Sequence, residues 1–326
     1  MILVTGGAGF IGSCLLAALT ARGQRTIIVD WLGSGEKWRN IARHPPEQIV
    51  APEALDDYLR DGPRLEAVVH LGAISETVAR DGDRTWHTNV ELSRRLWLWC
   101  AAHGARFLYA SSAATYGAAE GPDGFSDDPA RLASLRPLNL YGFTKHAFDL
   151  WVAATVARGE PAPSQWVGLK FFNVYGPNEL HKGSMVSVVK VKYDEVARGD
   201  TPRLFRSDRT GLADGAQARD FIWVGDVVDV LLWLLDEPRV SGLFNCGTGV
   251  ARSYLDLAHA VCDAAGAAHA VDFMDMPEAL RGQYQSFTQA DMTRLRAAGY
   301  GRQFTALEAG VARYVQEHLL RGEPHL

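Results

Sequence analysis

The feature that constrains this chain most is a glycine-rich turn that begins within its first ten residues. Residues 1–4 form a short apolar run typical of a buried strand, and residues 5–12 continue it as Thr-Gly-Gly-Ala-Gly-Phe-Ile-Gly. A helix is expected next, over residues 13–22. Glycines here allow a tight turn and let a pyrophosphate approach the helix N-terminus, so the pattern predicts a dinucleotide site. The glycines that satisfy G-x-G-x-x-G are Gly7, Gly9 and Gly12.

An acidic residue stands where a dinucleotide-binding unit needs one. A second strand is expected over residues 26–29, and Asp30 follows at its carboxyl end, where a carboxylate can accept hydrogen bonds from the adenosine ribose. Lys37 comes shortly afterwards. It either neutralises the 2′-phosphate of NADP or is an ordinary solvated lysine, and the sequence leaves both readings open. NADP is therefore the expected cofactor, with NAD as the alternative.

Short apolar strands and amphipathic helices alternate through the first half of the chain. Further strands are expected over residues 67–70, 107–110 and 165–172, with helices over 90–102 and 145–156. This alternation predicts an α/β fold, a Rossmann-type doubly wound parallel sheet, followed by a smaller C-terminal α/β substrate-binding lobe over the carboxyl ends of its strands. The NAD(P)-binding domain is expected to span 1–173 plus about 220–250, and the lobe 174–219 and 251–326.

The second half of the chain has weaker patterns. We expect a loop over residues 206–219, then a strand over 221–224, with Asp226 as the N-cap of a strongly apolar helix over 227–235. The remaining expected elements are a strand over 242–246 and helices over 254–265 and 305–320.

Composition narrows the class of partner. The 326 residues carry a net charge of −5, which gives no general attraction to nucleic acid or to an anionic membrane surface. No apolar run is long enough to cross a bilayer. The four cysteines are scattered without a C-x-x-C pair, so neither a disulfide framework nor a metal site is predicted. A cytoplasmic enzyme acting on a small molecule is expected.

Tyr141 and Lys145 form a Tyr-x-x-x-Lys pair that carries redox chemistry in a suitable fold. Residues four apart share one face of a helix, so the ammonium can lie near the phenol and favour the phenolate. Such a tyrosine can relay a proton as a hydride moves between substrate and nicotinamide. Ser112, at the end of a buried strand, either shares the substrate's hydrogen bond or merely caps the strand; we favour the first role.

Together these residues resemble the extended short-chain dehydrogenase/reductase superfamily, whose members mostly act on nucleotide sugars. The resemblance covers nearly the whole chain, through His70-Leu71-Gly72-Ala73, Asn89-Val90, Phe172-Asn173-Val174-Tyr175-Gly176-Pro177, Arg219-Asp220-Phe221 and Phe244-Asn245-Cys246-Gly247-Thr248-Gly249. With the glycine-rich turn, it implies that the cofactor is lined by Gly6, Gly9, Phe10, Ile11, Gly12, Asp30, Trp31, Lys37, Leu71, Gly72, Ala73, Ile74, Ser75, Asn89, Lys145 and Val174.

Two longer stretches, residues 173–185 and 282–300, resemble the ADP-L-glycero-D-manno-heptose 6-epimerase family. The resemblance implies that C6 of ADP-D-glycero-D-manno-heptose is oxidised to a ketone and reduced on the opposite face, for the lipopolysaccharide inner core. It also implies a homo-oligomer, and a second acid/base at Lys182 opposite Tyr141; a plain phosphate contact is the alternative role for Lys182. The implied substrate-binding residues are Ser112, Asn173, Ser184, Phe205, Arg219 and Tyr284.

Other activities of the superfamily remain as alternatives. A nucleotide-sugar 4,6-dehydratase carries an Asp-Glu pair directly after the hydroxyl residue, and Ala113 and Ala114 occupy those places here. A UDP-hexose 4-epimerase needs no counterpart of Lys182 and is the better alternative. A cofactor-sensing regulator that has lost catalysis is a distant one, because both Tyr141 and Lys145 are present.

Overall fold

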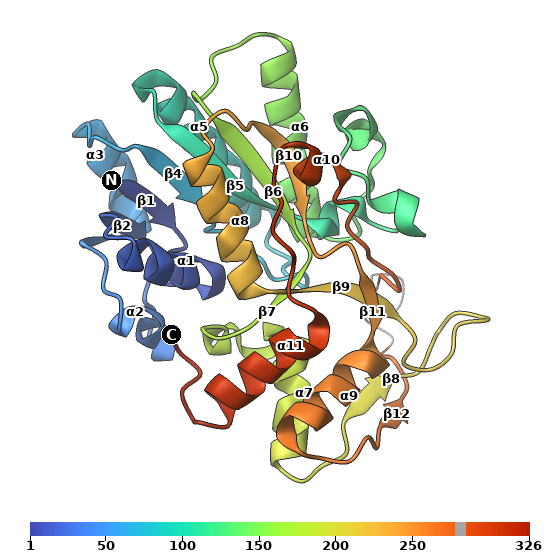
Figure 1. The fold of residues 1–326 in the computed structure, drawn as a ribbon. Helices are drawn as coiled ribbons and strands as arrows, with labels where there is room; N and C mark the ends of the chain where they lie inside the picture. The colour runs from blue at the N-terminus through green and yellow to red at the C-terminus, as the bar shows by residue number, and fades with distance from the viewer. Residues whose placement is uncertain (278–284) are drawn as a thin grey trace.

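The computed structural model describes residues 1–277 and 285–326, and its centre is a seven-stranded parallel sheet (Figure 1). The strand order is β3-β2-β1-β4-β5-β6-β10, so the first strand lies inside the sheet and the order reverses beside it. The strands are β1 (Ile2–Thr5), β2 (Thr26–Val29), β3 (Gln48–Val50), β4 (Ala67–His70), β5 (Arg106–Ser112), β6 (Trp166–Phe171) and β10 (Gly242–Cys246). The doubly wound parallel sheet expected from the sequence is confirmed.

Both faces of this sheet are covered by helices because its strands are apolar on both sides. Val4 belongs to one hydrophobic cluster, with Leu15 of α1 and Leu231 of α8. Leu3, its neighbour in β1, belongs to the other, with Trp97 of α5. Successive residues of a strand point to opposite faces, so the uninterrupted apolar runs of these strands require a helical layer on each side.

Most of the longer helices cover the two faces of this sheet, and a second group lies beyond the carboxyl ends of its strands, together with the short strands. Figure 1 shows α7, α9 and α11 gathered with the short strands β8 and β12 at one end of the molecule, beyond β7 and β9. The helices are α1 (Phe10–Ala21), α2 (Arg39–Ala42), α3 (Leu55–Arg60), α4 (Gly82–Trp86), α5 (Leu92–His103), α6 (Leu140–Ala157), α7 (Val188–Ala197), α8 (Val224–Asp236), α9 (Tyr254–Ala265), α10 (Thr293–Ala297) and α11 (Leu307–Ala312). Two small sheets join β7 (Asn173–Tyr175), β9 (Ala218–Trp223) and β11 (Ala251–Ser253), and β8 (Arg203–Phe205) and β12 (Asp272–Met274).

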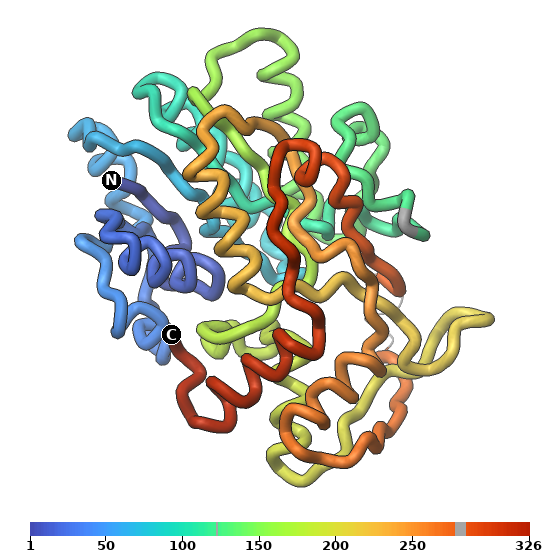
Figure 2. Tube along the Cα trace, viewed as in Figure 1, coloured from blue at the N-terminus to red at the C-terminus, as the bar shows by residue number. Residues whose placement is uncertain are grey.

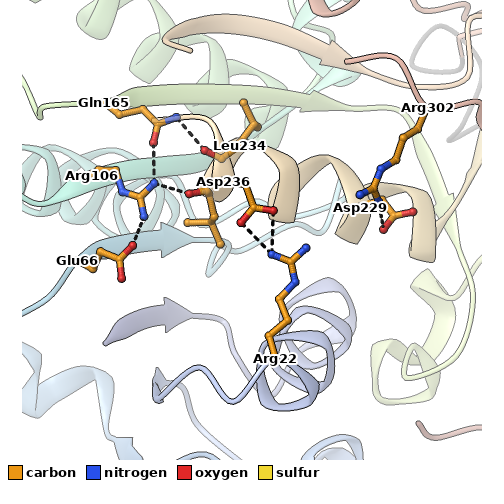
Figure 3. Close-up of polar contacts among 9 residues, drawn as sticks. Arg22, Glu66, Arg106, Gln165, Asp229, Leu234, Asp236 and Arg302 are labelled. Atoms are coloured by element: carbon orange, nitrogen blue, oxygen red, sulfur yellow. Dashed lines mark hydrogen bonds and ion pairs between the residues drawn. The ribbon is translucent and has the colours of Figure 1, made fainter. Parts of the chain in front are cut away.

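Polar side chains tie the start of β5 to the end of α8 (Figure 3). Arg106 donates to the carbonyl oxygen of Leu235 at 2.7 Å and pairs with Glu66. Gln165 donates to the carbonyl oxygen of Leu234 at 3.0 Å. Because the last carbonyl groups of a helix have no partner within it, these contacts satisfy the end of α8 and fix it on the sheet.

The last residues of the chain return to α2, close to the glycine-rich turn (Figure 2). His325 contacts the side-chain oxygen of Asn40 at 2.8 Å, and the backbone N–H of Leu326 donates to the side chain of Asn178 at 2.8 Å. Asn40 also donates to the carbonyl oxygen of Ala8 at 2.9 Å. Helix α2, the loop at Asn178 and the last residues of the chain are therefore joined next to the glycine-rich turn.

The structure corrects several expected boundaries. Helix α1 begins at Phe10 instead of residue 13, and α6 begins at Leu140 instead of residue 145. Strand β9 begins at Ala218, which shortens the expected loop. The prediction that Asp226 caps its helix is wrong, because α8 begins two residues earlier; the Asp226 carboxylate instead accepts hydrogen bonds from Thr305 N–H and Oγ1 at 2.7 and 2.9 Å.

The helices and the cysteines bear on two further expectations from the sequence. Within residues 1–277 and 285–326 no helix has the length and apolar character required to cross a membrane. All four cysteines are buried and unpaired, as expected for small apolar core residues.

Candidate active site

The glycine-rich turn joins β1 to α1 with its backbone packed too tightly for side chains. Gly6 has φ of +68°, and a Cβ placed there would lie 2.7 Å from the backbone nitrogen of Gly72. A Cβ on Gly12 would collide with the carbonyl oxygen of Gly6. Gly9 is the residue before the first turn of α1, in which Phe10 and Ile11 follow. Backbone N–H groups without side chains, at the N-terminus of a helix, suit the pyrophosphate of a dinucleotide. The residues present therefore fit a nicotinamide dinucleotide cofactor.

Asp30 and Lys37 lie together at the carboxyl end of β2. The Asp30 carboxylate accepts a hydrogen bond from Ala8 N–H at 2.9 Å, which ties it to the glycine-rich turn. Its other oxygen lies 2.6 Å from Nζ of Lys37, which also donates to the carbonyl oxygen of Trp31 at 2.9 Å. The Trp31 ring itself is half exposed. This corner therefore offers a carboxylate and an ammonium to the adenosine half of a dinucleotide.

Asn89 holds the loop that follows β4 against the helix that carries Tyr141. Its side chain accepts from Ile74 N–H at 2.8 Å and donates to the carbonyl oxygen of Ile74 at 2.9 Å. It also donates to Oγ1 of Thr144 in α6 at 3.0 Å. The expected cofactor-lining residues Leu71, Gly72, Ala73, Ile74 and Ser75 are thus fixed between the glycine-rich turn and α6.

Tyr141 lies in the first turn of α6, opposite the end of β5. The helix starts there because Asn139 caps it, accepting a hydrogen bond from Gly142 N–H at 2.8 Å. The hydroxyl of Ser112 lies close enough to the Tyr141 phenol to influence its ionisation. Burial raises the pKa of Tyr141, and the Ser112 contact partly offsets the rise. Ser112 also accepts from Ala114 N–H at 3.1 Å, so it caps the 3₁₀ turn Ala113–Tyr116 that follows β5.

Lys145 is buried one turn after Tyr141 on the same helix. Removal of its ammonium from water lowers the pKa of Lys145 to about 8, and the negative charge of Asp149 opposes the change. The pair predicted from the Tyr-x-x-x-Lys spacing is therefore placed on one helix and beside Ser112.

Lys182 lies over the first turn of α1, on the 3₁₀ turn Leu180–Met185. Its Nζ is 5.2 Å from the centre of the Phe10 ring. Burial lowers the pKa of Lys182, whereas Glu179 raises it. His181, beside it, contacts Asn40 at 3.1 Å. The segment that follows β7 thus brings Lys182 to the helix end of the glycine-rich turn.

The expected substrate residues come from the segments beyond the sheet. Asn173 and Ser184 are exposed, and Phe205 ends β8. Val174, expected at the cofactor, lies in β7 and pairs with Ile222 of β9. Arg219 is buried, with its guanidinium 5.6 Å from the centre of the Tyr254 ring, so its contact with a diphosphate stays a prediction. Tyr284 lies outside the described residues.

The pattern of these residues matches a known family of enzymes. The model of the NAD dependent epimerase/dehydratase family covers residues 2–247, which include the glycine-rich turn, Tyr141 and Lys182. The chain belongs to this family.

Two relatives that this chain matches over their full length carry the same name. The present chain is 46% identical over 330 residues to the ADP-L-glycero-D-manno-heptose-6-epimerase of Nitratidesulfovibrio vulgaris strain Hildenborough, with 100% of both chains covered. It is 41% identical over 338 residues to that of Fusobacterium nucleatum, again with 100% of both covered. The structure of the Helicobacter pylori enzyme of the same name superposes with a TM-score of 0.81 at 25% identity, over 97% of this chain and 95% of that one.

A further solved structure contains a nicotinamide cofactor. The UDP-glucose 4-epimerase of Thermus thermophilus, in complex with NAD, superposes with a TM-score of 0.75 at 25% identity, over 97% of each chain. The family of this epimerase is thus one of nicotinamide-dependent enzymes that act on nucleotide sugars.

Two of the sequence motifs of this epimerase meet through one buried carboxylate. Asp220, next to Arg219, accepts hydrogen bonds from the N–H and Oγ1 of Thr248, both at 2.7 Å, and from Gly249 N–H at 2.9 Å. It also accepts from Ala290 N–H at 3.0 Å. Asp220 therefore holds the loop after β10 and the segment at residue 290 against β9.

Sequence reasoning missed a buried ion pair under the Tyr141–Lys145 pair. The Asp149 carboxylate lies 2.8 Å from Nζ of Lys170 in β6, and Ser111 and Tyr109 donate to it at 2.7 and 3.0 Å. Both charged side chains are almost fully buried. The spacing of Asp149, four residues after Lys145, was the available signal, because it places both on one helix face. In the described part of the chain no group of three or more candidate metal ligands comes together.

Proposed function

We propose that this epimerase interconverts ADP-D-glycero-D-manno-heptose and ADP-L-glycero-D-manno-heptose at C6, for the lipopolysaccharide inner core. The observation that carries the proposal is the position of Lys182, the lysine of the His181-Lys182 motif, over Phe10 at the start of α1. A second acid/base is useful on the opposite face of the reacting carbon, and Lys182 is the candidate for it besides Tyr141. The full-length relatives at 46% and 41% identity support the choice of sugar.

The chemistry requires C6 to lose a hydride and its hydroxyl oxygen to lose a proton, and both to be returned when the ketone is reduced. A bound nicotinamide would supply the hydride acceptor for the oxidation and the hydride donor for the reduction. Tyr141 exchanges the hydroxyl proton on one face, with Ser112 sharing the hydrogen bond and Lys145 favouring the phenolate. Lys182 exchanges the proton on the other face after the ketone has rotated. Over one cycle no electron is gained or lost.

NADP is the cofactor proposed for this cycle. Asp30 suits a ribose hydroxyl but repels a 2′-phosphate, and the ammonium of Lys37, 2.6 Å away, offsets that repulsion. We further propose that residues 1–173 and about 220–250 hold this cofactor, while residues 174–219 and 251–326 hold the nucleotide sugar. A homo-oligomer is part of the same proposal, and light scattering of the purified protein tests it.

The direct test is to incubate the purified protein with ADP-D-glycero-D-manno-heptose and to resolve the two epimers. We expect a mixture of both epimers without added oxidant or reductant. UDP-glucose and UDP-galactose serve as competing substrates. Interconversion of these two, with the heptose left unchanged, would replace the proposal by a 4-epimerase activity.

Lys182→Met tests the two-base part of the proposal. We expect kcat to fall by about 10²- to 10⁴-fold, the usual contribution of a positioned acid/base, with little change in KM. The matched control is Lys190→Met, which removes a lysine paired with Asp194 on α7 and should leave kcat unchanged. A raised KM with unchanged kcat would make Lys182 a phosphate contact only.

An analogue with an aldehyde at C6 separates the two faces, because its dismutation needs no inversion. Tyr141→Phe and Lys182→Met should each cripple the reaction on one face and leave measurable chemistry on the other. If Lys182→Met instead epimerises the natural substrate like the wild type at saturation, the two-base mechanism is wrong.

A further inference from the structure

Glu179 is a fully buried carboxylate beside Lys182 that the reaction just described does not use. It directly precedes the 3₁₀ turn Leu180–Met185, and its own carbonyl oxygen accepts a hydrogen bond from Lys182 N–H at 3.0 Å. Its side chain reaches over the turn to Ser187, at the start of α7. Ser187 N–H donates to Oε2 at 2.5 Å and the Ser187 hydroxyl donates to Oε1 at 2.6 Å.

This arrangement closes the turn that carries Lys182. Glu179 stands at its beginning and Ser187 just after its end, so two hydrogen bonds join the ends of the segment. Gly183, within it, has φ of +56° and ψ of −122°, a backbone shape that favours glycine. The turn is therefore fixed by the carboxylate at its ends and by glycine within.

The hydrogen bonds also favour the ionised form of Glu179. Both carboxylate oxygens accept from donors, whereas a protonated carboxyl would have to give one oxygen to its own proton. Burial raises the pKa of Glu179, while Ser187 and the positive charge of Lys182 oppose the rise. Each of the two groups thus favours the charged form of the other.

Other titratable groups around this pair keep one charge state across neutral and mildly alkaline pH. His181, on the same turn, has its pKa lowered to about 4 by burial, with Lys37 and Asp30 acting on it in opposite directions. Burial raises the pKa of the Cys14 thiol on α1 and of the Tyr314 phenol on the segment after α11. Burial thus favours the neutral form of all three of these groups, and the charges in the turn are those of Glu179 and Lys182.

We propose that Glu179 is a positioning residue that closes the turn over the glycine-rich loop and supplies the negative charge that lets Lys182 carry its proton. The proposal rests on the proposed role of Lys182 as the second acid/base. Without the carboxylate, the ammonium of Lys182 would lie in a poorly hydrated site and would lose the negative charge of Glu179 that favours it, so the lysine would be neutral over more of the working pH range.

Glu179→Gln tests the charge, because glutamine keeps the size and one acceptor oxygen. We expect the Lys182 limb of the kcat–pH profile to move to lower pH by about one unit, while the other limb stays in place. Ser187→Ala is the matched control, since it removes one hydrogen bond but leaves the carboxylate; its limb should stay where the wild type has it. A Glu179→Gln limb that does not move, or that moves to higher pH, overturns the proposal.

A second readout does not depend on turnover. The pH dependence of acetylation of Lys182, followed by peptide mass spectrometry with Lys190 as internal reference, reports the lysine itself. Glu179→Gln should make Lys182 react at a pH about one unit lower than in the wild type. If Lys182→Met keeps full kcat, the proposed role of Lys182 as the second acid/base fails, yet this labelling result still decides whether Glu179 favours the charged form of the lysine.

If Glu179→Gln does not fold, the same two measurements are made on Glu179→Asp instead. Aspartate keeps the charge but draws it back by one methylene, so both the limb and the labelling midpoint should move in the same direction by less. An unchanged midpoint in Glu179→Asp, together with normal cofactor binding, would then overturn the proposal.

Discussion

The ammonium of Lys37 lies 2.6 Å from the Asp30 carboxylate, at the point where β2 meets the adenosine half of the proposed cofactor site. If this pair receives a 2′-phosphate, Lys37→Ala should weaken NADP binding by about 10- to 100-fold, the range for a hydrogen bond to a charged group, and change NAD binding little. Fluorescence titration of the apoprotein with both cofactors measures the ratio. An unchanged NADP/NAD ratio would contradict this account of cofactor choice.

Tyr141→Phe removes the phenolic oxygen alone and should spare the fold. The variant should bind cofactor as the wild type does and lose about 10²- to 10⁴-fold in kcat, because the proton relay is gone. Lys145→Met should lose both cofactor affinity and rate, since that lysine serves the ribose and the phenol together. Stopped-flow and equilibrium cofactor binding distinguish the two variants, and near-normal turnover of Tyr141→Phe would remove it from the mechanism.

His70 makes the protein sensitive to acid. Its ring is held between Thr5 Oγ1 at 2.6 Å and Ser93 Oγ at 2.8 Å, and burial, with a smaller effect of Lys145, lowers its pKa to about 3. An unfolded histidine titrates near pH 6.5, so below that pH the unfolded chain binds one more proton than the native one. Stability must therefore fall as the pH drops from about 6.5 towards 3.

The histidine should account for about 2 kcal/mol of the free energy of unfolding lost between pH 7.5 and 5. In His70→Gln this part of the loss should disappear, although the variant is less stable at pH 7.5. Urea unfolding at several pH values provides the measurement, with the exposed His103→Gln as control. Equal pH dependence in His70→Gln and the wild type would show that the ring is not buried in its neutral form.

Asp149 and Lys170 should behave as a buried pair whose members depend on each other. Lys170→Met leaves a carboxylate in the core without its cation and should cost about 3–5 kcal/mol of stability. The double variant Asp149→Asn, Lys170→Met should recover much of that loss, because no lone charge remains. A double-mutant cycle by denaturant unfolding gives the coupling; a single-variant loss below 1 kcal/mol, typical of exposed pairs, would contradict it.

The parts of the fold set by local pattern were predictable from the sequence. Strands β1, β2 and β4 and helix α9 lie where apolar runs and caps indicate them. Helix α6 was placed too late because its start depends on the Asn139 cap, a local signal that the apolar pattern alone does not show. The Tyr141–Lys145 pair needed only helical spacing, and the structure places Ser112 beside it.

Contacts between distant segments could not be derived in this way. Lys170 meets Asp149 only because β6 pairs with β5, which brings a strand residue to a helix 21 positions earlier in the chain. A carboxylate four residues from a lysine is usually a solvated surface pair. Burial distinguishes the cases, and burial is a property of the assembled sheet and helices.

The position of β10 in the sheet determines which fragments of this chain can fold. This strand pairs with β6, yet β7, β8 and β9 separate the two along the sequence. A fragment that ends before residue 242 would leave the whole edge of β6 open, and an unprotected strand edge is a template for pairing with other chains. Truncation libraries, split-protein designs and fragment expression should therefore fail by aggregation at any cut between these two strands, unless the missing strand is supplied as a peptide.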